Sequence, residues 1–169
     1  MCNCNCNCKS NKELNVKVKY IDPNIGKLVK TEKGDLIDLR ASEVIVNGES
    51  IEFDGQPVYY KAGDVVFIKL GIAMEMPKGY TAKVYPRSST FKNYGLILTN
   101  SVGCLDHSFK GDNDQWCAMF YALRDGKINY NDRVCQFEIH KSIMNDFTFN
   151  EVDNLNNETR GGYGSTGVK

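Results

Sequence analysis

The chain carries the stretch LNVKVKY at residues 14–20, in which apolar and polar side chains alternate. Successive side chains of a β-strand point to opposite faces, so this pattern predicts a strand with one buried face. Similar runs recur along the chain, separated by turn sequences such as Asn47-Gly48 and Asp125-Gly126. Further strands are expected at residues 43–46, 50–53, 58–60, 65–70, 82–85, 96–99, 116–123, 133–140 and 147–152.

Many short strands with regular turns indicate an all-β barrel or a jelly-roll-like sandwich. A helical turn is expected only near residues 88–94. We expect one β-barrel domain at residues 11–153, preceded by a Cys/Asn-rich tail at residues 1–10. A polar linker and a glycine-rich segment that acts as a lid follow at residues 154–169.

The charges of the chain balance, with 21 Lys plus Arg and 21 Asp plus Glu. No net charge therefore draws it to nucleic acid or to an anionic membrane. No apolar run approaches the length needed to span a bilayer, and the N-terminus lacks the apolar core of a secretory signal. We expect a soluble, cytoplasmic protein without nucleic-acid or membrane partners.

Four of the seven cysteines alternate with Asn at positions 2, 4, 6 and 8. Thiolates suit zinc and copper(I), but this C-x-C spacing differs from the C-x-x-C pairs of zinc knuckles. An exposed, oxidation-prone tail is the favoured interpretation. The other three, Cys104, Cys117 and Cys135, lie in apolar or strand-like contexts that favour core or near-core positions.

Two segments have the composition of a phosphate-binding site. In PRSST at residues 86–90, Arg87, Ser88 and Ser89 offer a guanidinium, hydroxyls and backbone N–H groups. In RGGYGSTG at residues 160–167, the glycines let backbone N–H groups approach an anion. The segment is not a P-loop, because no Lys stands at the position that a P-loop requires. The alternatives are a helix N-cap for the first segment and a frayed tail for the second.

Asp106 is the candidate catalytic carboxylate. It lies in NSVGCLDHSFKGD at residues 100–112, a segment interpreted as a hairpin, with the ring of Phe109 three positions on. An Asp there could hold a water or a sugar hydroxyl, and an Asx-turn residue is the alternative. His107 and His140 lack a Ser or Cys relay pattern and are interpreted as surface or strand residues.

Asp38 and Arg133 are predicted to form a buried structural ion pair. Alternation along DRVCQ at residues 132–136 places Arg133 on the face of Cys135 and Phe137, where its charge needs a carboxylate partner. Asp38 lies between apolar residues and is the candidate partner, whereas Gln136 faces the other way.

The order of these motifs resembles that of a known family. The chain carries DLRA at residues 38–41, then PRSS, NSVGCLDHSFKGD, DRVCQ and RGGYGSTG. This order is similar to the five motifs of the trimeric dUTPases, especially those of Firmicute bacteria and their phages. The resemblance implies a jelly-roll-like distorted β-barrel and a homotrimer with sites at subunit interfaces. It also implies hydrolysis of dUTP to dUMP and pyrophosphate, which limits uracil in DNA and supplies dUMP for thymidylate synthesis.

The resemblance also implies a role for each site residue. Asp106 would hold the water that attacks the α-phosphorus. Asn100 and the backbone at Gly103 and Leu105 would bind the uracil edge, and Phe109 would pack against the sugar. The phosphates would be bound by Arg87, Ser88, Ser89, Gln136, Arg160, Gly164, Ser165 and Thr166, and Tyr163 would lie over the base. Mg²⁺ would be held mainly through the triphosphate, with no direct protein ligand assigned.

Some departures and rival functions are open. Phe109 stands where the family usually has Tyr, Tyr163 stands where it has Phe, and residues 113–115 lengthen the segment after Gly111. A dCTP deaminase of the same fold needs a Glu beside the base, and the chain has none between Glu75 and Glu138. A phage-type regulatory protein that docks onto a repressor is the other alternative, with residues 47–63 and 110–115 as contact surfaces.

Overall fold

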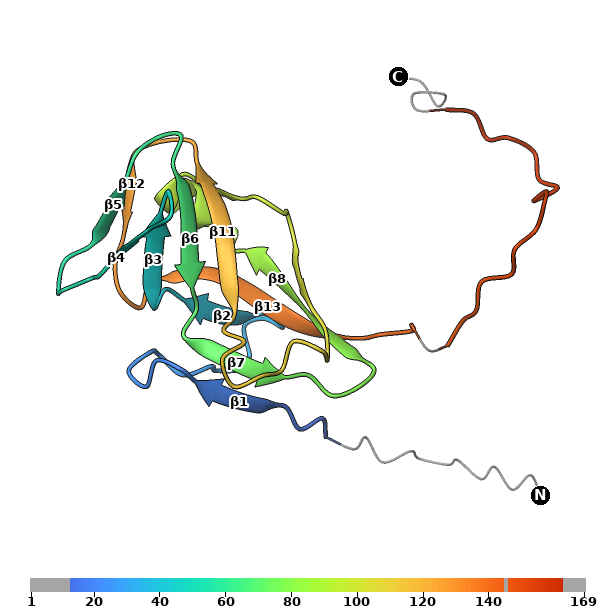
Figure 1. Cartoon of the computed structure of the whole chain (residues 1–169), viewed down its shortest axis with the longest axis horizontal. Helices are drawn as coiled ribbons and strands as arrows, with labels where there is room; N and C mark the ends of the chain where they lie inside the picture. Colours follow the sequence, from blue (N-terminus) through green and yellow to red (C-terminus); the bar gives the residue numbers. More distant parts are fainter. Residues whose placement is uncertain (1–12, 145, 163–169) are drawn as a thin grey trace.

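The structure, a computed structural model, describes residues 13–144 and 146–162 of the chain. Its regular structure is almost entirely β (Figure 1). The strands are β1 (Lys17–Tyr20), β2 (Ile37–Arg40), β3 (Glu43–Val46), β4 (Glu49–Ile51), β5 (Val58–Tyr60), β6 (Val65–Lys69), β7 (Ile72–Glu75), β8 (Tyr80–Pro86), β9 (Leu96–Leu98), β10 (Gly103–Leu105), β11 (Cys117–Ala122), β12 (Gly126–Ile128) and β13 (Arg133–Lys141). One short helix, α1 (Thr90–Tyr94), confirms the predicted helical turn. Within these described ranges no helix is long and apolar enough to cross a membrane.

Two antiparallel sheets enclose one core. One has the strand order β4-β3-β6-β11-β9 and the other β10-β8-β13-β2, while the short pairs β1-β7 and β12-β5 extend the barrel (Figure 1). Inward-facing side chains of both sheets fill the interior, among them Leu39, Ile68, Val84, Trp116, Phe120 and Phe137. The all-β, jelly-roll-like barrel expected from the sequence is confirmed.

Alternation along the strands explains which face each presents. In β11, Ala118, Phe120 and Ala122 are buried while Met119 and Tyr121 are exposed. In β1, Val18 and Tyr20 are half-buried and the lysines are exposed. The strand predicted at residues 14–20 is thus confirmed from residue 17 onward.

The segment at residues 100–112 is not a hairpin. β10 pairs with β8, with Gly103 opposite Val84 and Leu105 opposite Ala82, whereas β9 pairs with β11 in the other sheet. The chain crosses between sheets at the turn around Ser101, whose φ is +59°. Turn residues flanked by apolar runs indicate a reversal of the chain but do not specify which strands pair.

The strand predicted at residues 147–152 is also absent. Among the described residues, the chain beyond Lys141 forms no strand and runs away from the barrel (Figure 1). Its apolar side chains are strongly exposed, with Phe149 at 87% and Leu155 at 80% of full accessibility. An apolar pattern makes a strand only where a partner accepts the backbone hydrogen bonds. The domain boundary at residue 153 stays a prediction.

The three described cysteines occupy different environments. Cys135 is buried, which raises the pKa of its thiol, and burial of the half-buried Cys117 raises its pKa to about 11. Cys104 is exposed, contrary to expectation, because it faces outward on β10 between the half-buried Gly103 and Leu105. Positions 2, 4, 6 and 8 lie outside the described residues.

Candidate active site

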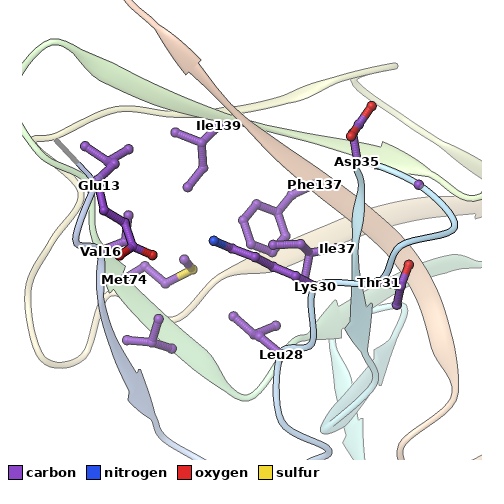
Figure 2. A pocket seen from close by; sticks show the side chains of 13 residues that line it. Glu13, Val16, Leu28, Lys30, Thr31, Asp35, Ile37, Met74, Phe137 and Ile139 are labelled. Carbon is purple, nitrogen blue, oxygen red and sulfur yellow. The ribbon is translucent and has the colours of Figure 1, made fainter. Parts of the chain in front are cut away.

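A cavity of about 580 Å³ opens between β1 and the β13–β2 edge of the second sheet (Figure 2). Its walls are mainly apolar, with Phe137 and Ile139 of β13 facing Met74 of β7, and the side chain of Lys30 extends across it. None of the predicted site residues lines this cavity. Its volume therefore does not mark the predicted site.

Arg87 lies where β8 ends, and a carboxylate of β2 fixes its guanidinium. Its Nε donates to Asp38 Oδ1 at 2.6 Å, and the two side chains are only 24% and 28% exposed. Its Nη1 lies 3.5 Å from Ser89 Oγ. A half-buried arginine held at one edge by a carboxylate keeps its other N–H groups in a fixed direction, as recognition of a phosphate requires.

The serines beside Arg87 are not used as helix caps. Ser89 occupies the N-cap position of α1 but makes no side-chain capping hydrogen bond, and Ser88 is exposed. The hydroxyls are therefore free of the role that the alternative interpretation gave them, and they remain available to a ligand.

Thr90 holds this turn in place, a role that sequence analysis did not assign. It is fully buried, its Oγ1 accepts from Arg87 N at 2.8 Å, and it donates to Val134 O at 2.9 Å. One hydroxyl thus joins the turn at Arg87 to β13. The position of this Thr, directly after PRSS and at the start of a short helix, could have indicated its role from the sequence.

We expect Thr90→Val to lower the free energy of unfolding by about 2–3 kcal/mol, because a buried N–H and a buried carbonyl lose their partner. Urea unfolding at one fixed protein concentration measures this. Thr90→Ser keeps the hydroxyl and should lose clearly less. Equal losses in the two variants would show that packing of the methyl group, not hydrogen bonding, accounts for the effect.

Arg133 does pair with Asp38, but the pair is not buried as predicted. The Nη1–Oδ2 distance is 3.1 Å, and the Arg133 side chain is 52% exposed. A register shift between Arg133 and Cys135 breaks the alternation, so Arg133 faces outward while Val134 and Cys135 are both buried. A β-bulge adds one residue on one strand and so reverses the faces that follow. Asp38 therefore lies between two guanidiniums, and the cluster keeps a net positive charge.

Gln136 lies beside this cluster. On β13 it is opposite Asp38 of β2 and Tyr85 of β8, and its Nε2 donates to Pro86 O at 3.3 Å. The structure thus brings together Asp38, Arg87, Ser89, Arg133 and Gln136 as one polar cluster with spare donors.

Asp106 follows β10 and is exposed. Its Oδ1 accepts from Ser108 N at 2.8 Å and from Ser108 Oγ at 2.6 Å. The hydroxyl and then the backbone N–H of Ser108 lower the pKa of the carboxyl below its usual range, so it is ionised at neutral pH. Oδ2 enters none of the hydrogen bonds found among the described residues.

The other residues predicted to contact the nucleoside lie near Asp106 in sequence. Asn100 is exposed in the turn before β10, and Phe109 is 38% exposed after it. Gly103 packs closely on β8, since an added Cβ would lie 3.2 Å from Val84 Cβ. Leu105 is half-buried against the core. This backbone therefore has a fixed position over β8.

The strand register separates Asp106 from Arg87 within one chain. Because Leu105 lies opposite Ala82, the next position places Asp106 beside Thr81, at the start of β8. Arg87 follows the end of the same strand, six residues further, which is about 20 Å at about 3.3 Å per residue. Within one chain, Asp106 and the Arg87 cluster therefore lie toward opposite ends of β8, and we refer to them as two candidate half-sites.

The C-terminal candidates are only partly described. Arg160 is exposed on the C-terminal arm, as we call the described chain beyond Lys141, and contacts neither half-site in the described hydrogen bonds and ion pairs. Tyr163, Gly164, Ser165 and Thr166 lie outside the described residues.

The acidic residues after Gly111 are engaged within the protein. Asp112 pairs with Lys19 at 3.2 Å, and Asp114 Oδ2 accepts from Gly111 N at 2.6 Å. No group of three or more His, Cys, Asp or Glu side chains is arranged to hold a metal in the part of the chain that the structure describes.

The structure is an all-β barrel in which a polar cluster around Arg87 and the exposed Asp106 carboxylate are separate groups. The family model for dUTPase matches residues 55–167. A SPbeta prophage-derived deoxyuridine 5'-triphosphate nucleotidohydrolase, YosS of Bacillus subtilis, is 48% identical over 156 residues, which is 92% of this chain and 100% of the relative. A deoxyuridine 5'-triphosphate nucleotidohydrolase of Rickettsia bellii is 31% identical over 90% and 95% of the two chains.

Solved structures agree on the fold. The dUTPase of Staphylococcus bacteriophage 80alpha with dUPNHPP superposes with a TM-score of 0.69 at 16% identity, covering 91% of this chain and 99% of the other. A dUTPase from phage phi11 of S. aureus, solved to show the coordination of a structural Mg(II) ion, has a TM-score of 0.66 at 13% identity, covering 84% and 99%. The chain belongs to the dUTPase family.

Proposed function

We propose that the protein hydrolyses dUTP to dUMP and pyrophosphate, with Asp106 as the general base. The observation that carries the proposal is the Asp106 carboxylate, which is ionised, fixed at Oδ1 and open at Oδ2. Oδ2 holds a water and takes its proton as the water attacks the α-phosphorus. The bond from that phosphorus to the bridging oxygen breaks, and pyrophosphate leaves. In a cell this activity keeps uracil out of DNA and provides dUMP for thymidylate synthesis.

The half-site around Arg87 binds the phosphates. Arg87 and Ser89 face them together with Ser88 and Gln136, and the Asp38 carboxylate orients the guanidinium. The backbone from Asn100 to Leu105 binds the uracil edge and Phe109 packs against the deoxyribose. Arg160 contributes a further guanidinium to the phosphates, together with residues 163–166, which lie outside the described residues.

Mg²⁺ bound to the triphosphate would offset the charge that develops on the phosphates. The pairing of Asp112 with Lys19 and of Asp114 with Gly111 supports a site that adds no protein carboxylate to the ion. The residues of this chain then have only to position the phosphates and the water.

The working unit is a homotrimer whose sites each combine the Asp106 half-site of one copy with the Arg87 half-site of another. The separation of the two half-sites along β8 supports this arrangement. The run of exposed apolar side chains on the arm supports contact with a second copy, since extended exposed apolar surface often marks an interaction site. This run comprises Phe147, Phe149, Val152 and Leu155. A closed cyclic assembly gives every copy the same two contacts.

The activity is tested with the purified protein, Mg²⁺ and dUTP, dCTP, dTTP or UTP, measuring pyrophosphate and the base of the product. Pyrophosphate from dUTP alone is the expected result. Ammonia from dCTP would contradict it, and this outcome also tests the deaminase alternative.

The structural relatives from phage 80alpha are described as controlling transfer of virulence genes. A pull-down from host lysate tests whether this chain binds a repressor, and the absence of a bound partner would count against that role.

If each site is shared between two copies, trimers that mix two inactive variants in equal amounts should regain activity. Asp106→Asn and Arg87→Ala homotrimers should each be nearly inactive. When the two are unfolded together and refolded, about a quarter of the sites should combine a wild-type Asp106 with a wild-type Arg87 from different copies. Activity near that fraction supports sites between copies. No recovery, with trimers confirmed by light scattering, would mean that both groups act from one chain.

Removing residues 160–169 should lower kcat for dUTP about 100-fold or more, because the proposed phosphate donor Arg160 is lost. The oligomeric state should stay unchanged, because Phe149 and Leu155 are retained. Steady-state kinetics and light scattering measure the two effects. Full activity in the truncated protein would reduce the segment to a tail.

A further inference from the structure

The orientation of the Asp106 carboxylate depends on its neighbour Ser108. Ser108 N donates to Asp106 Oδ1 at 2.8 Å, and Ser108 Oγ donates to the same oxygen at 2.6 Å. Any residue other than proline would supply the backbone donor. The second donor requires a hydroxyl at position 108.

We propose that Ser108 is a positioning residue that acts through Asp106. Its hydroxyl donates a hydrogen bond to Oδ1 and so fixes the orientation of the carboxylate. Oδ2 then points toward the attacking water. The inference rests on the proposed role of Asp106 as the base. A base whose direction is fixed before the reaction needs no reorganisation during it.

The bonds to Ser108 also act on the charge of the base. Hydrogen bonds to the ionised form favour it, and the Ser108 hydroxyl is the largest influence that lowers the pKa of Asp106. The carboxylate then remains ionised in mildly acidic solution.

A purely structural turn would behave differently. Asp106, His107 and Ser108 are all exposed, so the turn contributes little to the core. Loss of the Ser108 hydroxyl should therefore leave thermal stability nearly unchanged and appear in the reaction. This separates positioning of the base from support of the fold.

The experiment compares Ser108→Ala, Ser108→Thr and a matched control, Ser50→Ala. Ser50 Oγ donates to Glu43 Oε1 at 3.0 Å on exposed β4, so the control also removes a serine–carboxylate bond but does so away from both half-sites. The measurements are kcat and KM for dUTP with Mg²⁺, the pH profile of kcat/KM, and Tm.

Ser108→Ala should lower kcat about 10-fold, because a general base contributes about 100- to 10,000-fold and one of its two fixed bonds is lost. KM should stay within about twofold, and the acid limb of kcat/KM should move to higher pH. Ser108→Thr should stay close to wild type, as should Ser50→Ala.

An unchanged kcat and acid limb in Ser108→Ala would overturn the inference while leaving the proposed function intact. A lower Tm with an unmoved acid limb would assign Ser108 to the turn alone, with the same consequence. A wild-type protein that releases no pyrophosphate from dUTP would refute the proposed function, and this inference with it.

Discussion

Asp106→Asn should lower kcat for dUTP by about 1,000-fold, within the range that a general base contributes. Asparagine keeps the shape of the side chain and can still accept from Ser108 N, so the turn should survive. It cannot take a proton from water, because the amide is not basic. Initial rates of pyrophosphate release measure the loss.

Binding provides the control for this variant. Asp106→Asn should bind a non-hydrolysable dUTP analogue with nearly wild-type affinity in calorimetry. A loss of binding that matches the loss of rate would make Asp106 a nucleotide ligand and not the base. Turnover that persists would remove it from the reaction altogether.

The same carboxylate sets an expectation for pH. Ser108 lowers the pKa of Asp106 in the folded protein, so Asp106 loses its proton at a lower pH than an unperturbed aspartate. Activity should therefore persist below neutral pH and fall only when the solution approaches the lowered pKa. This acid limb should be absent from any residual activity of Asp106→Asn.

Arg87→Ala should lower kcat/KM by about 100- to 1,000-fold, because one preorganised donor to charge that develops in a reaction is typically worth that much. Much of the loss should remain in Arg87→Lys, since an ammonium carries the charge but cannot donate from a planar fork. Steady-state kinetics over a range of dUTP concentrations separate the effect on kcat from that on KM.

Arg133→Ala is the control for the charge cluster. It removes the second guanidinium at 3.1 Å from Asp38 and leaves the Arg87–Asp38 bond of 2.6 Å in place. Its effect should be several-fold smaller than that of Arg87→Ala. Equal losses would mean that net positive charge alone, without the orientation of Arg87, binds the phosphates.

The parts of the fold that follow from local chemistry were predictable from sequence. Alternation at residues 14–20 and the serine-rich turn after Pro86 both appear as expected, in β1 and α1. Pairing between distant strands was not predictable, because period-two alternation identifies a face and not a partner. The wrong hairpin at residues 100–112 and the absent strand at residues 147–152 share this cause.

The errors at single residues have a similar origin. Arg133 was assigned to the buried face by counting alternate positions, and the register shift before Cys135 reverses that count. Thr90 was missed because its two partners, Arg87 N and Val134 O, lie on segments that only the fold brings together. The Asp38–Arg133 pair was predicted correctly but for a wrong reason, because Arg133 is 52% exposed and its charge does not require a buried partner.

The length of β8 sets the distance between the two half-sites. Its two ends carry the approaches to the two half-sites, so in the proposed trimer each copy of β8 acts as a spacer between neighbouring sites. Inserting two residues into β8 would preserve its inward and outward faces. It would also increase the distance between the half-sites by about 7 Å. Side chains along β8 are thus free to vary as the core allows, whereas the number of residues in it is fixed by the assembly.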